Sequence, residues 1–129
     1  MKELSKNLGG MEYDGLITGL NPPIRVDGGI IAKLGTSTVY ERGTVLAKSA
    51  KDGLLYILGT DPMDGDTLTP DCILCEDTEV GTEEDTPAVV YAAGCFDPEK
   101  VKLADGYTIT QADKDKLRAY SIIFKAAVG

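Results

Sequence analysis

Two cysteines three positions apart are the first feature of this chain that could do chemistry. Cys72 and Cys75 stand in the stretch Cys-Ile-Leu-Cys beside several carboxylates, and the third cysteine is Cys95. Zinc sites and redox pairs both use closely spaced cysteines. In a chain with three cysteines and no histidine, a zinc ion would need a carboxylate as its fourth ligand. Three interpretations are therefore open: metal ligands, a redox pair, or structural residues.

The local pattern favours structural cysteines. The stretch is apolar and is bounded by Pro70-Asp71 and Glu76-Asp77, which predicts a short buried strand. On a strand, residues three apart point to opposite faces and lie about 10 Å apart, whereas a disulfide needs Cα atoms within about 4.4–6.8 Å. In a non-secreted chain the default is free thiols. We therefore expect free thiols here, with no metal and no cofactor.

A second candidate is the acidic stretch Asp-Pro-Met-Asp-Gly-Asp, which contains Asp61, Asp64 and Asp66. A calcium loop of the EF-hand type needs oxygen ligands at its first, third and fifth positions. Counting from Asp61, the third and fifth positions hold Met63 and Gly65. This stretch is therefore predicted to be a solvated turn.

The composition excludes several classes of function. The 129 residues include no histidine and no tryptophan, so Ser-His-Asp and Cys-His machinery are excluded. With 21 acidic and 13 basic residues and a net charge of -8, the chain lacks the basic cluster that binds nucleic acid. Its apolar runs are too short to span a membrane, and its N-terminus has no apolar signal core. We expect a soluble, non-secreted protein that is no enzyme and binds neither nucleic acid nor membrane.

The first forty residues differ in character from the rest. Isolated apolar residues are mixed there with Gly and Asn, without a lasting helical or alternating period, and Pro22-Pro23 favours an extended path. We predict an extended N-terminal arm over residues 1–40 and a β-rich domain over residues 41–129. The apolar positions of the arm suggest that it docks on its own domain or on a partner. The candidate docking residues are Leu16, Ile17, Leu20, Pro22, Pro23, Ile24 and Val26.

The remaining sequence predicts short strands separated by turns. Strand signals bounded by Gly, Asp or Pro recur at residues 29–35, 43–49, 54–59, 71–77 and 88–96. Asp52-Gly53 between two apolar runs is the strongest hairpin signal. The acidic stretch 76–85 is expected to be an exposed loop. Together these signals favour a mainly antiparallel β-barrel or sandwich.

One helix is predicted near the C-terminus. Thr110 is a suitable N-cap, and Asp113 three residues later makes a weak capping box. The apolar residues that follow, Ile122 and Ile123, predict a closing strand.

The order of these segments resembles the lambda-type head decoration proteins of tailed bacteriophages. The resemblance covers roughly Arg42 to Val128 and rests on "GTVLAK", the "DGLLY" hairpin, "CILCEDTEV", "AVVYAAGCFDPEKV" and the helix in "ADKDKLRAYSIIF". It implies a small β-tulip or barrel-like domain with one short C-terminal helix. A glycine is expected at the end of that helix, where this chain has Tyr120-Ser121.

The resemblance also implies a function. Such a protein is made in the host cytoplasm and binds the major capsid protein on the outside of the expanded head. It does so as a homotrimer, and it stabilises the capsid against the pressure of the packaged DNA. The N-terminal arm would lie along the major capsid protein and add a strand to it. The alternative is another virion β module, such as a carbohydrate-binding tail or fibre adhesin.

Overall fold

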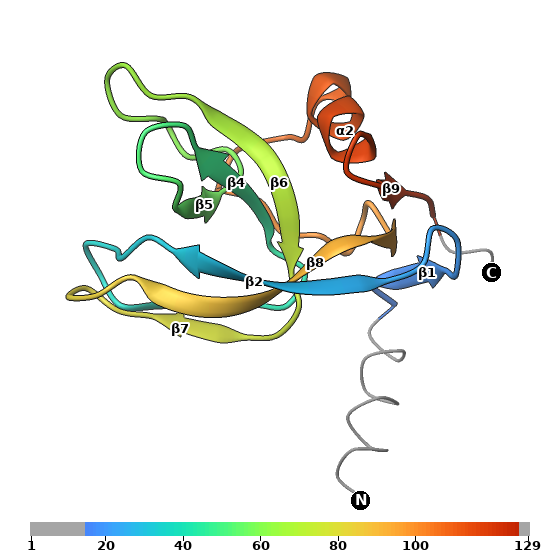
Figure 1. Cartoon of the computed structure of the whole chain (residues 1–129), viewed down its shortest axis with the longest axis horizontal. Coiled ribbons are helices and arrows are strands. Elements are labelled where there is room, and N and C mark those ends of the chain that lie inside the picture. Colours follow the sequence, from blue (N-terminus) through green and yellow to red (C-terminus); the bar gives the residue numbers. More distant parts are fainter. Residues whose placement is uncertain (1–14, 127–129) are drawn as a thin grey trace, which may run out of the picture.

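One long strand, β8 (Thr86–Phe96), organises the fold. The computed structural model describes residues 15–126 (Figure 1). Along the first half of β8, Ala88 and Val90 face the core, whereas Pro87 and Val89 are exposed. This alternation is the period of two that a half-buried strand requires. The strand pairs antiparallel with β2 (Arg25–Ile31) in its first part and with β1 (Ile17–Gly19) at its end, where β9 (Ile122–Phe124) runs parallel to it.

Five strands close into a barrel. From β8 the order runs through β2, β5 (Leu55–Ile57), β4 (Val45–Ser49) and β6 (Leu68–Leu74), and β6 pairs with β8 again. The predicted hairpin at Asp52-Gly53 joins β4 to β5, and Gly53 adopts a positive φ of 72°. The predicted mainly β, barrel-like fold with one short C-terminal helix is therefore confirmed.

A separate two-stranded sheet lies beside the barrel. It consists of β3 (Thr38–Tyr40) and β7 (Thr78–Val80), which pair antiparallel. The prediction that residues 76–85 form only an exposed loop was wrong, because β7 lies within this stretch. The reason is Val80, which is fully buried in the barrel core with Leu74 and Val90 and so anchors the strand.

The boundary predicted at residue 40 does not separate an arm from a domain. Residues 25–31 form β2, which pairs with β8 at every position and is a wall of the barrel. Between β1 and β2 the chain bends, with a cis peptide bond between Asn21 and Pro22 instead of the expected extended path. Leu16 and Ile31 of this segment lie in the core of the protein, whereas Leu20, Val26 and Ile30 are exposed. Residues 1–14, the rest of the predicted arm, lie outside the described residues.

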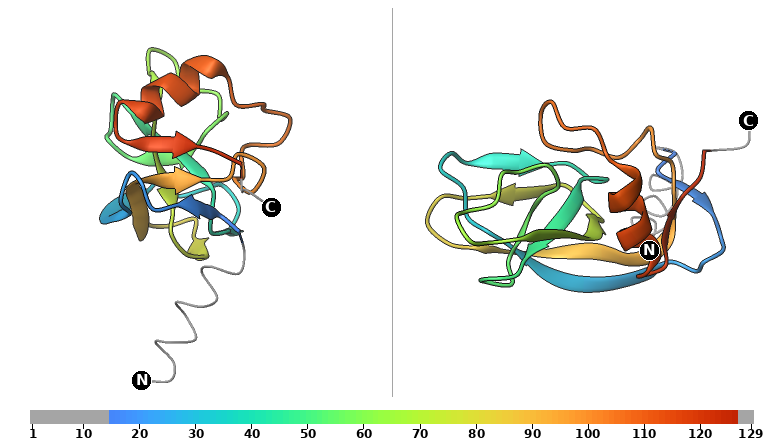
Figure 2. Two further views of the ribbon diagram at one scale, coloured as in Figure 1. Left: turned by 90° about the vertical axis from the view of Figure 1, so that its right-hand side faces the viewer. Right: turned by 90° about the horizontal axis from the view of Figure 1, so that it is seen from above.

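The helix α2 (Gln111–Arg118) packs against β6 and β9 (Figure 2). Thr110 caps it, and its hydroxyl accepts from the Asp113 N–H at 3.0 Å, as the sequence predicted. Leu117 is its buried residue and enters the core cluster that contains Tyr91, Phe96 and Ile122. Ser121 follows the helix with a φ of 68°, in the left-handed region that favours glycine. The strand expected after the helix is β9.

Candidate binding surface

The cysteines occupy structural positions. Cys72 lies on β6 and Cys95 on β8, each 2% exposed, and Cys75 directly after β6 is half-buried. All three thiols are free, and burial raises the pKa of the Cys72 thiol above its ordinary value. A thiol kept protonated in this way is a poor nucleophile and a poor metal ligand. Across residues 15–126, no three His, Cys, Asp or Glu side chains are grouped so that they could hold a metal ion.

The acidic side chains of the turns accept hydrogen bonds from the turns themselves. Asp66 accepts hydrogen bonds from the Ser49 hydroxyl at 2.5 Å and from the Lys51 N–H at 3.1 Å. Both bonds lower the pKa of Asp66, and the bond from Ser49 has the larger effect. The Leu54 N–H likewise lowers the pKa of Asp52, with a further contribution from the Tyr56 hydroxyl. Both carboxyl groups are held as anions, which is the opposite of the raised pKa typical of a catalytic acid.

A buried tyrosine is tied to an arginine where β6 and β8 cross. The Arg42 guanidinium lies 5.4 Å from the centre of the Tyr91 ring, and it also donates to the Tyr91 hydroxyl and to the Cys75 carbonyl. Desolvation raises the pKa of Tyr91 to about 12. The Phe96 ring packs against Tyr91 with 5.3 Å between the ring centres. This cluster stabilises the barrel where β6 and β8 meet, and it exposes no reactive group to solvent.

The outer face of the β2–β8 ribbon carries a contiguous apolar surface. Residues opposite one another in an antiparallel pair point to the same side, and Gly28 lies opposite Val89 and Ile30 opposite Pro87. Val26, two residues before Gly28, belongs to the same face. Val26 is 52% exposed, Ile30 48% and Val89 37%. We call Val26, Gly28, Ile30, Pro87 and Val89 the β2 strip.

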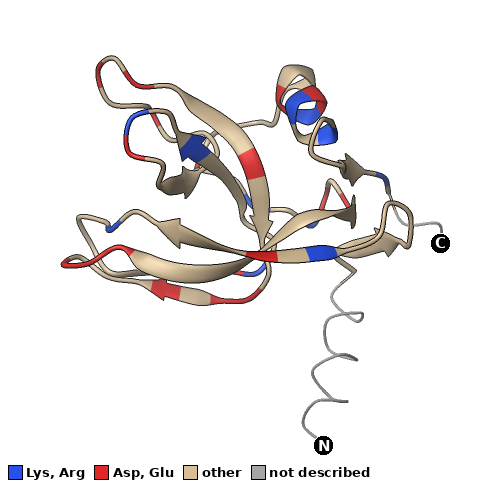
Figure 3. Cartoon of the chain, in the orientation of Figure 1, with Lys and Arg blue, Asp and Glu red and all other residues tan. Residues whose placement is uncertain are grey.

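Charged side chains lie beside the β2 strip and not within it. The charged residues of β2 are Arg25 and Asp27, which Figure 3 shows at the start of the strand. From Gly28 to Ile31 the strand is without charge. An exposed apolar face bordered by polar residues is typical of a surface that binds another protein.

The predicted docking residues divide into two groups. Leu16 is 2% exposed and lies in the core, and Ile17 and Ile24 pack against that core, so these three belong to the domain itself. Leu20 and Val26 remain available, with exposed fractions of 90% and 52%. Pro22 is half-buried and Pro23 is exposed in the bend between β1 and β2.

Ile30, Pro87 and Val89 were not predicted as surface residues. The signal that could have found them is the period of two in Val26-x-Gly28-x-Ile30, which matches Pro87-x-Val89 on the partner strand. It was hidden because β2 had been assigned partly to an arm and because residues 88–96 form one continuous apolar run.

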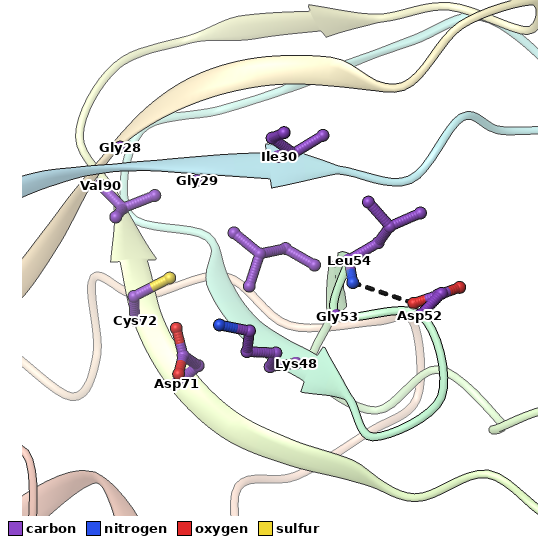
Figure 4. A pocket seen from close by; sticks show the side chains of 11 residues that line it. Gly28, Gly29, Ile30, Lys48, Asp52, Gly53, Leu54, Asp71, Cys72 and Val90 are labelled. Carbon is purple, nitrogen blue, oxygen red and sulfur yellow. Dashed lines mark hydrogen bonds between the residues drawn. The ribbon is translucent and has the colours of Figure 1, made fainter.

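A groove of about 320 Å³ lies between β2 and the β4–β5 hairpin (Figure 4). Its charged lining residues are Lys48, Asp52 and Asp71. Asp71 reaches the groove because the register of β4 against β6 shifts between the pairs Leu46–Cys72 and Ala47–Pro70. Pro70 cannot donate to a strand ladder, and such an irregularity re-aims the neighbouring side chain.

Comparisons with known proteins add no relative. No family model matches the chain, and no curated protein is similar to it. Among residues 15–126 no helix is long and apolar enough to cross a membrane.

Proposed function

We propose that this chain is a structural virion protein that decorates the outside of an expanded bacteriophage head. It binds the major capsid protein as a homotrimer and stabilises the capsid against the pressure of packaged DNA. It is made in the host cytoplasm, ends on the outer capsid surface, and has neither nucleic acid nor membrane as a partner. The observation that carries this proposal is the β2 strip, an uncharged apolar surface on the wall of a small barrel.

The fold supports the proposal. The resemblance to lambda-type decoration proteins implies a small barrel-like β domain with a short C-terminal helix, and the chain has that fold class. The titratable groups with shifted pKa values, such as Asp66 and Tyr91, are engaged in hairpin and core contacts. A role in binding therefore fits these residues better than a role in catalysis.

The β2 strip supplies the binding energy in this proposal. Val26 and Ile30 are each about half exposed, with fractions of 52% and 48%. Burying the rest of each side chain contributes about 1 kcal/mol. Affinity of this size is weak for one copy, but a homotrimer presents three strips to the shell at once, so each binding event raises the effective concentration for the next.

Leu20 extends the proposed contact beyond the strip. It is 90% exposed in the bend between β1 and β2, beside Pro22 and Pro23. A truncation that tests the arm must leave β1 and β2 in place. Because β1 begins at Ile17 and β2 at Arg25, such a truncation removes only residues before residue 15.

The test is saturation binding to purified expanded heads of a phage that encodes the chain, measured by co-sedimentation. The double variant Val26→Ser with Ile30→Ser should bind each site about 30-fold more weakly, since about 2 kcal/mol is lost. Val39→Ser is the matched control, because Val39 is 56% exposed but lies on β3, away from the strip. Equal binding by the double variant and the control would contradict the proposal, as would wild-type protein that leaves heads bare.

The alternative of a carbohydrate-binding adhesin has less support. Carbohydrate sites favour exposed aromatic rings, and among residues 15–126 the exposed aromatic residue is Tyr120, which is 45% exposed. Binding to a glycan array in the absence of head binding would favour this alternative.

A further inference from the structure

We propose that the free edge of β2 and the groove beside it accept residues 2–8 of a second copy as an added strand. This inference deepens the homotrimer of the proposed function, on which it rests, by naming the contact between copies. In the free protein, before any capsid protein is bound, the arm of one protomer would pair with the barrel of the next, and three such contacts would close a ring.

The edge of β2 turns backbone groups away from β8. The Val89 carbonyl accepts from the Cys75 N–H on the far side of β8, so Gly28, opposite Val89, turns its own N–H and carbonyl away from β8. The Gly28 N–H accordingly donates to the Asp27 carboxylate at 2.8 Å, and not to a strand. The same edge is used two positions beyond Ile30, where the Ala32 N–H donates to Leu55.

The edge is open because β5 covers only its end. β2 pairs with β5 at one position, Ile31 with Leu55, and before that position the groove lies beside the strand (Figure 4). Val26 and Gly28 are exposed along this stretch. An exposed strand edge is a template for a further strand. A short extended segment that pairs with β2 would therefore bind along this groove, between β2 and the β4–β5 hairpin.

The charges and apolar groups of the groove select the segment that fits. Three carboxylates, Asp27, Asp52 and Asp71, lie in or beside the groove, against one lysine, Lys48. The apolar lining includes Leu54 and Val90. A strand with lysine and a large apolar residue alternating on one face would satisfy both features.

The N-terminal sequence of this chain has that alternation. Lys2, Leu4, Lys6 and Leu8 would share one face of a strand, and Glu3, Ser5 and Asn7 would share the other. Gly9 and Gly10 follow these residues in the sequence. The open edge of β2 spans residues 25–30, because Ile31 pairs with Leu55 of β5, so residues 2–8 are one residue longer than this edge. The two lysines would face the groove carboxylates.

The direction of the chain points to a second copy. The Leu16 carbonyl accepts from the Asp97 N–H, and Ile17 lies opposite Phe96, so the described chain begins at the C-terminal end of β8. Gly15, the first described residue, therefore lies at that end of β8. The groove is lined by Gly28, Gly29 and Ile30 of β2, which pair with the other half of β8. An arm that joins the barrel at Gly15 is better placed for a neighbouring molecule than for the groove of its own barrel.

The test is zero-length carbodiimide crosslinking of the free full-length protein, after mixing ¹⁴N- and ¹⁵N-labelled copies. We expect amide links from Lys2 or Lys6 to Asp52 or Asp71, with peptides of mixed isotope composition by mass spectrometry. Links of unmixed composition only, or no such links, would overturn the proposal. No heads are present in this experiment, so a negative result is distinct from a failure to bind heads.

A matched pair of variants tests the edge itself. Gly28→Pro removes the edge N–H and blocks an added strand, whereas the ladder to β8 uses the neighbouring residues. Gly28→Ala keeps the N–H, and its Cβ meets nothing within 4 Å. We expect the yield of crosslinks of mixed isotope composition to fall at least about tenfold in Gly28→Pro and to be retained in Gly28→Ala. Circular dichroism of both variants verifies folding, and equal crosslinking by two folded variants would overturn the proposal.

Discussion

Replacing Ser121 with glycine should stabilise this protein, although a serine side chain is lost. Ser121 has a φ of 68°, and within residues 15–126 its hydroxyl makes no hydrogen bond. Its backbone is engaged: the Ser121 N–H donates to Arg118 at 2.9 Å, and its carbonyl accepts from Gly94 at 3.0 Å. The left-handed conformation is therefore held by the surrounding structure and not by the side chain.

The magnitude follows from two opposing effects. The left-handed conformation costs a non-glycine residue about 1–2 kcal/mol. Glycine removes that strain, but its greater freedom in the unfolded chain costs about 0.5–1 kcal/mol. The net gain for Ser121→Gly is about 0.5–1 kcal/mol, which corresponds to a rise in Tm of roughly 2–4 °C for a domain of this size.

The assay is thermal and urea unfolding followed by circular dichroism. Ser121→Ala is the matched control, because it removes the hydroxyl and leaves the backbone strain in place. Its stability should stay within about 0.5 kcal/mol of the wild type. Equal stability of the glycine and alanine variants would refute the assignment of strain to this residue.

Three further predictions concern the core and the hairpin. Leu117→Ala should lower the free energy of unfolding by about 2–5 kcal/mol, since Leu117 is fully buried. In the same urea titration, Lys116→Ala should have little effect, because Lys116 is exposed. Similar losses in the two variants would contradict the packing of Leu117. Gly59→Ala should lower the free energy of unfolding by about 2–4 kcal/mol, because the φ of Gly59 is 104° and the added Cβ would lie 2.5 Å from the Tyr107 ring. An unchanged Tm would show that Gly59 and Tyr107 are not in close contact. The hydrogen bond to Asp52 raises the pKa of Tyr56 from 10.0 to about 12, so its stabilisation is complete below pH 10 and is lost as the pH rises towards 12. Tyr56→Phe should flatten that alkaline loss in unfolding experiments, and an unaltered alkaline limb would contradict the assignment.

Local patterns in the sequence were sufficient for the elements that depend on neighbouring residues. The hairpin at Asp52-Gly53 and the helix capped by Thr110 both follow from side chains within a few positions of one another. Strand β6 was predicted only in part, because the strand signal at residues 71–77 overlaps its second half, whereas β6 begins at Leu68 and contains Pro70.

Long-range pairing is what the sequence did not reveal. β2 contains two glycines and two charged residues and is weak as an isolated strand, yet it pairs with seven positions of β8. β7 likewise depends on the burial of Val80 against distant residues of the barrel. The β2 strip was missed for the same reason, because Ile30 and Pro87 become neighbours only through that pairing.

Electron cryo-microscopy of expanded heads incubated with the purified protein tests the central claim most directly. We predict three-fold density on the outer surface of the shell, with Val26 and Ile30 of each copy turned towards the major capsid protein. Heads without added density, or density in which the β2 strip faces solvent, would contradict this account.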